Sequence, residues 1–552
     1  MDKIKVYIDG HGERQIDKGS TILDIAKDIF KENYRDYPIA IKNNIVQPLM
    51  RKVCDLDEIN FQHITSVWGY RAYTKTIAMI FSMAFAKLFP KQGCDLNHYL
   101  GAGLYIDFDN GFHLDEKDLK NLADEMKNII AKDIPIEMEK LSRKEALDHF
   151  ETHNRKDLVR LINTLDRDEI RVNSIAGYKE LYYLPLAPST SYTPEFRLMQ
   201  YYPGILLIAP SHRNNYDISH YNETPKLSKV FSQATDWAKI MDLNHLASLN
   251  EKVMANEYIE TIRISESLQD RRLVDIADTI SKDDDLRLIL ISGPTSSGKT
   301  TFSEKLMISL KVLGLTPVRI SMDDYFVDRD DTPKDENGEY DFESPYAVNI
   351  EAFNNDMNKL LNGEEIFVRR FDFLEGKNII TDQTFKIDKH SPIIIEGIHA
   401  LNPLLTNMVP EKNKFKIYIS ALTQLNIDSH SRISTTDTRF IRRAVRDYKY
   451  RGYSLEDTFK MWQNIRDSER KYIYPFQENA DVMFDSALAY EVCVLKKHIL
   501  PMLEEISEDS PYYSESIKLR KFVELFKDIE DEDAVPKNSI LREFIGGGYE
   551  EQ

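Results

Sequence analysis

The sequence predicts a multidomain protein in which α/β and α+β folds follow one another. Its 552 residues are enough for about three to four domains. Residues 288–314 contain an apolar strand, a glycine-rich loop and a helix, which together form the repeating unit of a parallel α/β sheet. Residues 1–63 instead alternate apolar and polar positions around one helical stretch, which indicates a small β-rich unit.

The first unit, residues 1–63, is expected to be a ubiquitin-like β-grasp domain. Strands are predicted at "IKVYIDG", "IAIKNNIVQPL" and "DEINF", and a helix at "TILDIAKDIF" with Ser20 as its cap. This pattern resembles the TGS domain, which is found at the start of threonyl-tRNA synthetases and in some regulatory GTPases. The unit is therefore predicted to be TGS-like.

The second unit, residues 64–225, contains two informative stretches, "GLYIDFDNGFHLDEKDLKNLADEMKNIIAKDIPIEMEKLSRKEAL" and "YYLPLAPSTSYTPEFRLM". Both resemble the second domain of threonyl- and alanyl-type synthetases, which hydrolyses wrongly charged tRNA. The resemblance implies an α+β domain whose editing groups are an H-x-x-x-H pair and a later C-x-x-x-H. The best-matching positions here are Arg71, Lys75, Tyr182 and Leu186, so we expect a domain that does not edit.

Two interpretations of this second unit stay open. Arg71 and Lys75 would give a cleft with two positive charges, suited to a carboxylate, a phosphate or a tRNA end. A tRNA or amino-acid ligand for the N-terminal half is therefore one expectation. The other is that the unit only supports the domain that follows it.

Composition narrows the choice of partners and compartment. A formal net charge of -19 argues against a general binder of nucleic acid or anionic membranes. No apolar run is long enough to span a membrane, so a cytoplasmic protein is expected. The cysteines form no C-x-x-C pair, which suits a reducing compartment, and we expect buried apolar roles for Cys54, Cys94 and Cys493. A homo-oligomer is compatible with these features.

Two further segments are expected to be helical. Residues 226–285 are charged and poor in glycine and proline, which predicts a helical connector. Residues 506–552 predict an acidic helical appendage with a mobile glycine-rich end.

The clearest chemical motif lies within residues 286–505. "GPTSSGKT" fits G-x-x-x-x-G-K-[ST] between a strand and a helix, so its backbone N–H groups are placed to wrap phosphates. Lys299 would reach the β- and γ-phosphates, and the Thr300 hydroxyl would bind Mg²⁺. The predicted nucleotide-binding residues are Gly293, Pro294, Thr295, Ser296, Ser297, Gly298, Lys299, Thr300 and Thr301.

Polar residues at the ends of other apolar runs predict the acceptor side of the same site. Asp323 and Asp324 follow one run and Glu396 ends another, at the edge where open α/β sheets bind ligands. Asp323 is the expected base for an attacking hydroxyl, and Glu396 the expected Mg²⁺ carboxylate. One helical face of fixed positive charges would hold phosphate oxygens in transit, and it consists of Arg439, Arg442, Arg443 and Arg446.

Seven motifs in order resemble the uridine kinase and phosphoribulokinase family over nearly all of residues 286–500. They are "GPTSSGKTT", "SMDDYF", "YDFESPYAVN", "RRFDF", "IIIEGIHAL", "DTRFIRRAVRD" and "YIYPFQENADVMFDSAL". The resemblance implies a P-loop kinase with a parallel sheet that uses ATP and Mg²⁺, the metal being held by Thr300 and Glu396. It implies catalytic roles for Asp323, Lys299, Arg442 and Arg446, and acceptor contacts by Asp323, Tyr325, Glu343, Phe371 and Arg439.

Departures from the family pattern bear on the acceptor. Glu343 stands where uridine kinases usually have aspartate, and Phe371 replaces a tyrosine that contacts the pyrimidine. The family's following histidine is Gly376 here. Loss of a phenol and an imidazole removes groups that would read a pyrimidine edge, so a preference for uridine is not expected.

The sequence thus predicts an ATP- and Mg²⁺-dependent kinase acting on a small acceptor, a hydroxyl of a nucleoside or a ribose-like molecule. An RNA- or tRNA-linked regulatory protein that uses the nucleotide as a switch remains an alternative, because the N-terminal half resembles a synthetase. A third hypothesis is a sugar or sugar-phosphate kinase, which differs from the first only in the acceptor.

Overall fold

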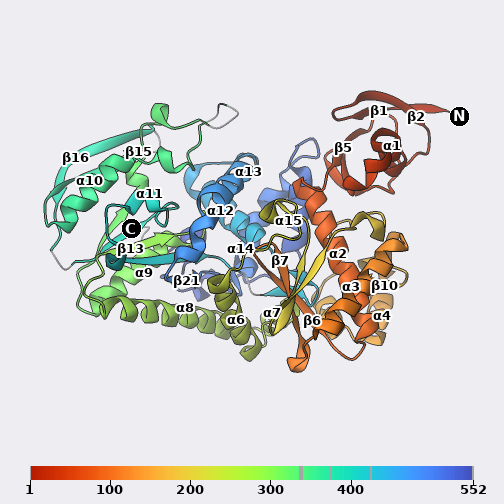
Figure 1. Cartoon of the computed structure of the whole chain (residues 1–552), viewed down its shortest axis with the longest axis horizontal. Helices are drawn as coiled ribbons and strands as arrows, with labels where there is room; N and C mark the ends of the chain where they lie inside the picture. Colours follow the sequence, from red (N-terminus) through yellow and green to blue (C-terminus); the bar gives the residue numbers. More distant parts are fainter. Residues whose placement is uncertain are drawn as a thin grey trace.

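The computed structural model describes residues 2–334, 338, 340–372, 375–388, 391–422 and 425–549. The N-terminal unit lies at one end of an elongated molecule, and the P-loop domain lies at the other, with the second domain between them (Figure 1). None of the helices in the described ranges is long and apolar enough to cross a membrane.

The N-terminal unit is a mixed sheet packed on one helix, α1 (Ile22–Phe30). The sheet has the order β2-β1-β5-β3-β4, with β1 (Lys3–Ile8) parallel to β5 (Glu58–Gln62). The other strands are β2 (Gly12–Asp17), β3 (Ile39–Lys42) and β4 (Ile45–Pro48). Its kinship with TGS domains stays a prediction.

Two sequence expectations for this unit were wrong. Thr21, not Ser20, caps α1, because Thr21 and Asp24 accept each other's backbone N–H in a capping box. The Ser20 hydroxyl donates instead to the Asp17 carbonyl. Cys54 is exposed, whereas Cys94 and Cys493 are buried as expected. Cys54 lies in a tight turn, in which its N–H donates to the Asp57 carboxylate.

The second domain consists of two antiparallel sheets and several helices. One sheet has the order β11-β12-β7-β6 and the other β10-β9-β8. The strands are β6 (Cys94–Leu100), β7 (Gly103–Phe108), β8 (Ile136–Ser142), β9 (Glu169–Ile175), β10 (Tyr178–Glu180), β11 (Arg197–Tyr201) and β12 (Gly204–Ile208). The helices are α2 (Val67–Leu88), α3 (Glu116–Ala131), α4 (Arg143–Thr152) and α5 (Lys156–Thr164).

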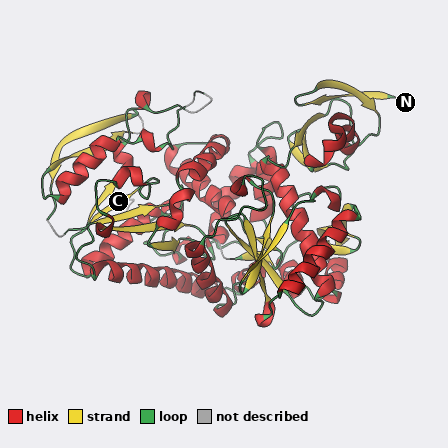
Figure 2. Ribbon diagram, viewed as in Figure 1, coloured by secondary structure: helices red, strands yellow, loops and turns green. Residues whose placement is uncertain are grey.

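Three helices follow as a connector, α6 (Pro225–Ile240), α7 (Leu246–Met254) and α8 (Tyr258–Ser281). In Figures 1 and 2, α8 runs as one long rod along the P-loop domain, next to α9. Its buried face carries apolar residues such as Ile262, Leu273 and Ile276, which join the main core of the P-loop domain. The connector is therefore part of the packing that supports the catalytic half.

The P-loop domain contains a five-stranded parallel sheet with the order β14-β17-β13-β18-β21. These strands are β13 (Leu288–Ser292), β14 (Val318–Ser321), β17 (Ile393–Glu396), β18 (Lys414–Ser420) and β21 (Val482–Asp485). The helices include α9 (Lys299–Val312), α10 (Ile350–Leu361), α11 (Pro403–Thr406), α12 (Thr435–Arg451), α13 (Leu455–Tyr472) and α14 (Glu491–Glu504). Two hairpins are added, β15 (Ile366–Asp372) with β16 (Lys377–Phe385), and β19 (Asn426–Asp428) with β20 (Ser431–Arg432).

The C-terminal segment, expected as an appendage, is packed into the same core. Apolar residues of α15 (Tyr513–Val523) and α16 (Arg542–Ile545), including Phe522 and Phe544, belong to the cluster that contains β13 and β18. The chain therefore returns to the P-loop domain, where its end lies in Figure 1.

Candidate active site

The P-loop connects β13 to α9 with the backbone turned toward a ligand position. Gly298, the residue before α9, has a φ of +84°, which a side chain would strain. The hydroxyls of Ser296 and Ser297 are buried, and none of the described residues forms a hydrogen bond with them. Unpaired buried hydroxyls are uncommon, and here they fit the oxygen atoms of a bound phosphate. The loop is thus built to receive a triphosphate.

The Lys299 ammonium lies within the curve of this loop. It donates to the carbonyls of Gly293 and Pro294, at 3.0 and 3.2 Å. Burial lowers the pKa of Lys299, while the charges of Glu396 and Asp323 oppose that shift. A buried lysine with carboxylates opposite it is placed to neutralise phosphate charge.

The predicted metal residues meet beside the loop. Glu396 ends β17, whose register sets it beside Ile291 of β13, and its Oε1 lies 3.3 Å from the Thr300 hydroxyl. Within the described ranges, no set of three or more His, Cys, Asp or Glu residues could enclose a metal. Magnesium in nucleotide sites takes one or two protein ligands and fills the rest with phosphate and water oxygens. The pair Thr300 and Glu396 fits that kind of site.

The predicted base faces the same place from the next strand. Asp323 stands in a 3₁₀ turn directly after β14, whose last residue, Ser321, is paired with Glu396. Its side chain keeps an exposed surface, yet burial by the surrounding protein raises its pKa, and the charges of Lys299, Arg451 and Arg446 counter that rise. A reachable carboxylate with modestly raised basicity suits proton acceptance from a hydroxyl.

The acceptor residues divide into two groups. Glu343 lies near Asp323, Lys299 and Arg443, and burial raises its pKa to about 7. Tyr325 instead packs inward: its ring is buried and its hydroxyl donates to Asp356. The Tyr325 hydroxyl is therefore bound within the protein, and its contact with the acceptor stays a prediction.

Phe371 and Gly376 are the two residues expected to lie beside the nucleobase of a nucleoside acceptor. Phe371 lies in β15 and packs edge-on against Phe326. Gly376 has a φ of +69°, and an added Cβ there would come within 2.8 Å of the Arg329 side chain. Arg329 thus occupies the space that a side chain at position 376 would need. Position 376 cannot supply an imidazole without displacing that guanidinium.

The arginines of α12 serve different purposes. Arg439 is buried and bonds to Glu469, the Tyr474 hydroxyl and the Thr295 carbonyl of the P-loop. Arg442 is buried between Glu491 and the Ser486 carbonyl, and its Nη1 lies 3.5 Å from the Ser296 carbonyl of the P-loop. Both therefore brace the loop from behind, whereas the sequence had placed them at the substrate and the phosphate.

Arg443 and Arg446 lie closer to the predicted chemistry. Arg443 donates to the Thr295 hydroxyl, and the charge of Arg446 acts on Asp323. Buried Asp447 pairs with both side chains and with Arg451. Sequence reasoning missed Asp447 and Arg451, although both continue the helical face that begins at Arg439.

Sequence reasoning also missed the support of the loop by α13. Glu469 is buried, holds Arg439, and accepts the backbone N–H of Thr295 at 3.1 Å. An unassigned carboxylate on a helix far along the chain offers no local signal, because its partner is reached only through the fold.

Comparison with known families agrees with this geometry. Residues 288–492 match the model described as the Phosphoribulokinase / Uridine kinase family. This part of the chain is a domain of that family. The match implies the use of ATP and Mg²⁺, and it makes the C-terminal region a P-loop kinase domain.

Curated relatives and solved structures each match a little over a third of the chain. A uridine kinase of Staphylococcus epidermidis is 26% identical over 208 residues, which are 38% of this chain and 91% of the relative. A uridine kinase of Staphylococcus haemolyticus is 26% identical over 209 residues, with the same coverage of 38% and 91%. A putative fructose transport system kinase from Silicibacter sp. TM1040 has 17% identity and a TM-score of 0.28, covering 38% of this chain and 98% of its own. A possible uridine kinase from Bacillus stearothermophilus has 19% identity and a TM-score of 0.27, covering 39% and 98%.

The C-terminal segment closes one side of the kinase P-loop. An added Cβ on Gly298 would lie 2.4 Å from Ile540, and Glu543 accepts from the Thr301 hydroxyl at 3.3 Å. Lys449 of α12 donates to the Ile545 carbonyl. Residues beyond the region that matches the family thus contribute to the shape of the nucleotide site.

Arg71 and Lys75 of the second domain each contact neighbouring side chains, so they do not form the open, positively charged cleft that was one expectation. Arg71 lies 3.7 Å from Asp437 at the start of α12 and also covers the Trp68 ring. Lys75 lies over the Tyr182 ring, and burial lowers its pKa to about 8. Leu186 is buried. Arg71 therefore joins the second domain to the kinase domain.

We expect the carboxylates of the kinase site to make stability depend on pH. Burial and the charge of Asp323 raise the pKa of Glu396 to about 7, above the ordinary value of 4.5 for a glutamate. The folded protein therefore holds that proton more tightly than the unfolded chain does, and stability is lost as pH rises through about 7. Melting temperatures of the wild type and Glu396→Gln, measured from about pH 5 to 8, should show a decline that is smaller in the variant. Equal declines in both proteins would contradict the assignment.

Proposed function

We propose that the protein is an ATP- and Mg²⁺-dependent phosphotransferase that phosphorylates a hydroxyl of a nucleoside or a ribose-like molecule. The observation that carries the proposal is the meeting of Lys299, Thr300, Glu396 and Asp323 at the carboxyl edge of one parallel sheet. That edge is where folds of this type bind ligands. The N–H groups, cations and carboxylates there are those that phosphoryl transfer needs.

Each side chain has a distinct part in this proposal. The P-loop and Lys299 hold the triphosphate, while Thr300 and Glu396 hold Mg²⁺, which neutralises charge between the β- and γ-phosphates. Asp323 accepts the proton of the attacking hydroxyl. Among the α12 arginines predicted from the sequence, Arg446 is the one whose charge acts on Asp323, together with that of Arg451, so it is a better candidate than Arg442 to stabilise the transferring group.

Glu343 is the proposed grip on the acceptor. Its carboxylate lies in a group with Asp323 and Lys299, and a carboxylate accepts two hydrogen bonds from neighbouring hydroxyls. A vicinal diol, as in ribose, offers two such donors. This chemistry favours a sugar-bearing acceptor over a simple alcohol.

We predict that uridine and cytidine are not strongly preferred as acceptors. Phe371 has no polar atom for a pyrimidine edge, and Arg329 fills the space beside Gly376. Competition assays with equal concentrations of uridine, purine nucleosides and free pentoses should show comparable phosphorylation. A strong preference for uridine would overturn this expectation.

For the N-terminal half we propose a non-editing derivative of TGS and synthetase-type domains that supports the kinase domain. The support for this is the Arg71–Asp437 ion pair and the buried position of Lys75 over Tyr182. A fragment of residues 1–225 that hydrolysed mischarged threonine-type tRNA would refute it.

A further inference from the structure

Two guanidinium groups from different domains lie over one aromatic ring. Arg213 of the second domain and Arg432 of the kinase domain stand 5.2 and 4.9 Å from the centre of the Tyr99 ring. Arg213 also donates to the Gly101 carbonyl at 2.9 Å. Cation–π contacts attract each guanidinium to the ring, but the two like charges repel each other. The contacts with the Tyr99 ring alone therefore do not explain why Arg213 and Arg432 lie so close together.

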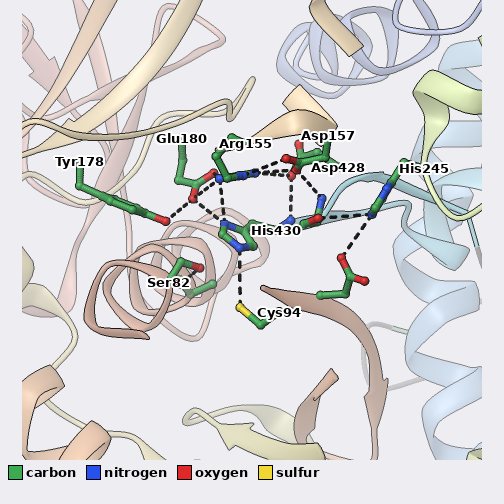
Figure 3. Close-up of polar contacts among 12 residues, drawn as sticks. Ser82, Cys94, Arg155, Asp157, Tyr178, Glu180, His245, Asp428 and His430 are labelled. Atoms are coloured by element: carbon green, nitrogen blue, oxygen red, sulfur yellow. Dashed lines mark hydrogen bonds and ion pairs between the residues drawn. The ribbon is translucent and has the colours of Figure 1, made fainter. Parts of the chain in front are cut away.

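The hairpin that carries Arg432 is fixed in place by a separate polar network (Figure 3). His430 bonds through Nδ1 to Glu180 at 2.5 Å, and Arg155 donates to the same carboxylate. Arg155 also lies 3.6 Å from Asp428. Because these contacts hold the turn of the β19–β20 hairpin on the second domain, Arg432 is delivered to Tyr99 in a defined position.

More cations approach the same junction from the kinase domain. Asp437 at the start of α12 is shared by Lys518, at 2.5 Å, and Arg71, at 3.7 Å. Arg466 of α13 lies near Arg71 and Arg470. Burial lowers its pKa to about 10, and the charges of Arg470 and Arg71 add to that shift. One carboxylate is thus surrounded by several basic side chains.

Asp437 is the carboxylate whose charge acts on Arg432 and Arg466, and it is shared with Lys518 and Arg71. Over the described part of the chain, Arg213, Arg432 and Arg466 form no ion pair with aspartate or glutamate. Burial lowers the pKa of Arg432, and the charge of Arg213 contributes to the shift. Arg432 and Arg466 are half-buried, whereas Arg213 is exposed. Holding half-buried cations without ion-pair partners costs stability, unless an anion enters.

We propose that Arg213, Arg432 and Arg466, with Arg71 beside them, form a binding site for a phosphate group, either inorganic phosphate or a phosphomonoester. Guanidinium forks match phosphate oxygens in geometry, and several of them together favour a dianion over a carboxylate. The hydroxyls of Tyr70 and Tyr99 lie close enough to influence each other, and they add neutral donors at the same place.

The site is separate from the P-loop but rests on the helices that support it. Arg466 lies one turn before Glu469 on α13, and Glu469 accepts from the P-loop N–H of Thr295. Arg432 immediately precedes the segment that enters α12. Occupancy of the site would therefore stabilise the arrangement of α12 and α13 against the second domain.

Binding is tested with the full chain carrying Lys299→Ala, which removes the main phosphate ligand of the P-loop. Calorimetric titrations use inorganic phosphate and, separately, ribose 5-phosphate. In that background Arg432→Ala is compared with Arg271→Ala, a control that removes a largely exposed arginine paired with Asp275 on α8. We expect Arg432→Ala to weaken phosphate binding by at least about tenfold and Arg271→Ala to leave it unchanged. Tighter binding of one ligand than the other identifies free phosphate or a phosphomonoester as the occupant.

Melting temperatures, recorded first without and then with phosphate, give a second measurement. In phosphate-free buffer, Arg432→Ala should melt at or above the temperature of the parent, because removing a half-buried cation that lies beside Arg213 and has no ion-pair partner outweighs the loss of its contact with the Tyr99 ring. Added phosphate should raise the melting temperature of the parent and not of Arg432→Ala. Equal affinity in the Arg432 and Arg271 variants, absence of phosphate binding by the parent, or a lower melting temperature of Arg432→Ala without phosphate would each overturn the proposal.

Discussion

Replacing Lys299 with alanine is expected to abolish productive use of ATP. The Lys299 ammonium lies inside the P-loop, 3.0 Å from the Gly293 carbonyl, where it would meet charge that develops between the β- and γ-phosphates. It is also the cation opposite Glu396 and Asp323. Its loss would remove a cation whose charge acts on both carboxylates beside the phosphate position. Turnover should be measured by coupled detection of ADP over a range of ATP concentrations.

A charge-preserving control separates the lysine's chemistry from the folding of the loop. Lys299→Arg keeps the charge but changes its reach, so it should keep a folded loop and recover little activity. Both variants should retain the wild-type circular dichroism spectrum. Undiminished turnover in Lys299→Ala would remove the basis for assigning the P-loop as the ATP site.

Asp323→Asn is expected to lower turnover by about 10²-fold or more while nucleotide affinity stays nearly the same. Asparagine keeps the shape of the side chain and loses the proton acceptor. Because Lys299 and the P-loop would still hold the triphosphate, binding of ATP should persist. The measurement is kcat with saturating acceptor, together with a titration of a fluorescent ATP analogue.

Asp324→Asn is the matched control, since the two carboxylates are adjacent. The Asp324 carboxylate accepts a backbone hydrogen bond from Phe371, and its carbonyl accepts from Asn378, so it ties the 3₁₀ turn to the β15–β16 hairpin. An amide oxygen can replace the carboxylate in that structural bond. If Asp324→Asn is the more damaging change, the base has been assigned to the wrong residue.

The nucleotide side of the site was predictable from sequence because its groups are local. Gly298, Lys299 and Thr300 are consecutive, and the strand before them and the helix after them are each visible in the pattern of apolar residues. Asp323 and Glu396 could be placed for a related reason: each follows an apolar run, and the carboxyl ends of parallel strands share one edge.

The roles of the α12 arginines could not be predicted in the same way. Helical spacing shows that Arg439, Arg442 and Arg446 share a face, but it does not show what packs on that face. Glu469 and Glu491 come from later helices and neutralise Arg439 and Arg442, which leaves Arg446 nearer to Asp323. Burial and pairing across the fold decided those roles.

The junction between the two halves was also hidden from the sequence. Asp428, His430 and Arg432 stand in an unremarkable loop of the chain, and their partners Glu180 and Tyr99 lie far earlier. Only the folded chain shows that this hairpin is seated on the second domain. The position of the C-terminal segment was hidden for the same reason, because Ile540 packs beside Gly298 although the two residues are far apart in the sequence.

The central claim is that the chain transfers phosphate from ATP to a hydroxyl of a small sugar-bearing acceptor. The most direct test is to incubate the purified full chain with ATP and Mg²⁺ and a panel of nucleosides and pentose derivatives, and to detect products by mass. We expect at least one acceptor to gain a single phosphoryl group, with ADP formed in equal amount and no product from the Lys299→Ala protein. Consumption of ATP that is independent of every acceptor, or that requires RNA instead, would contradict the claim.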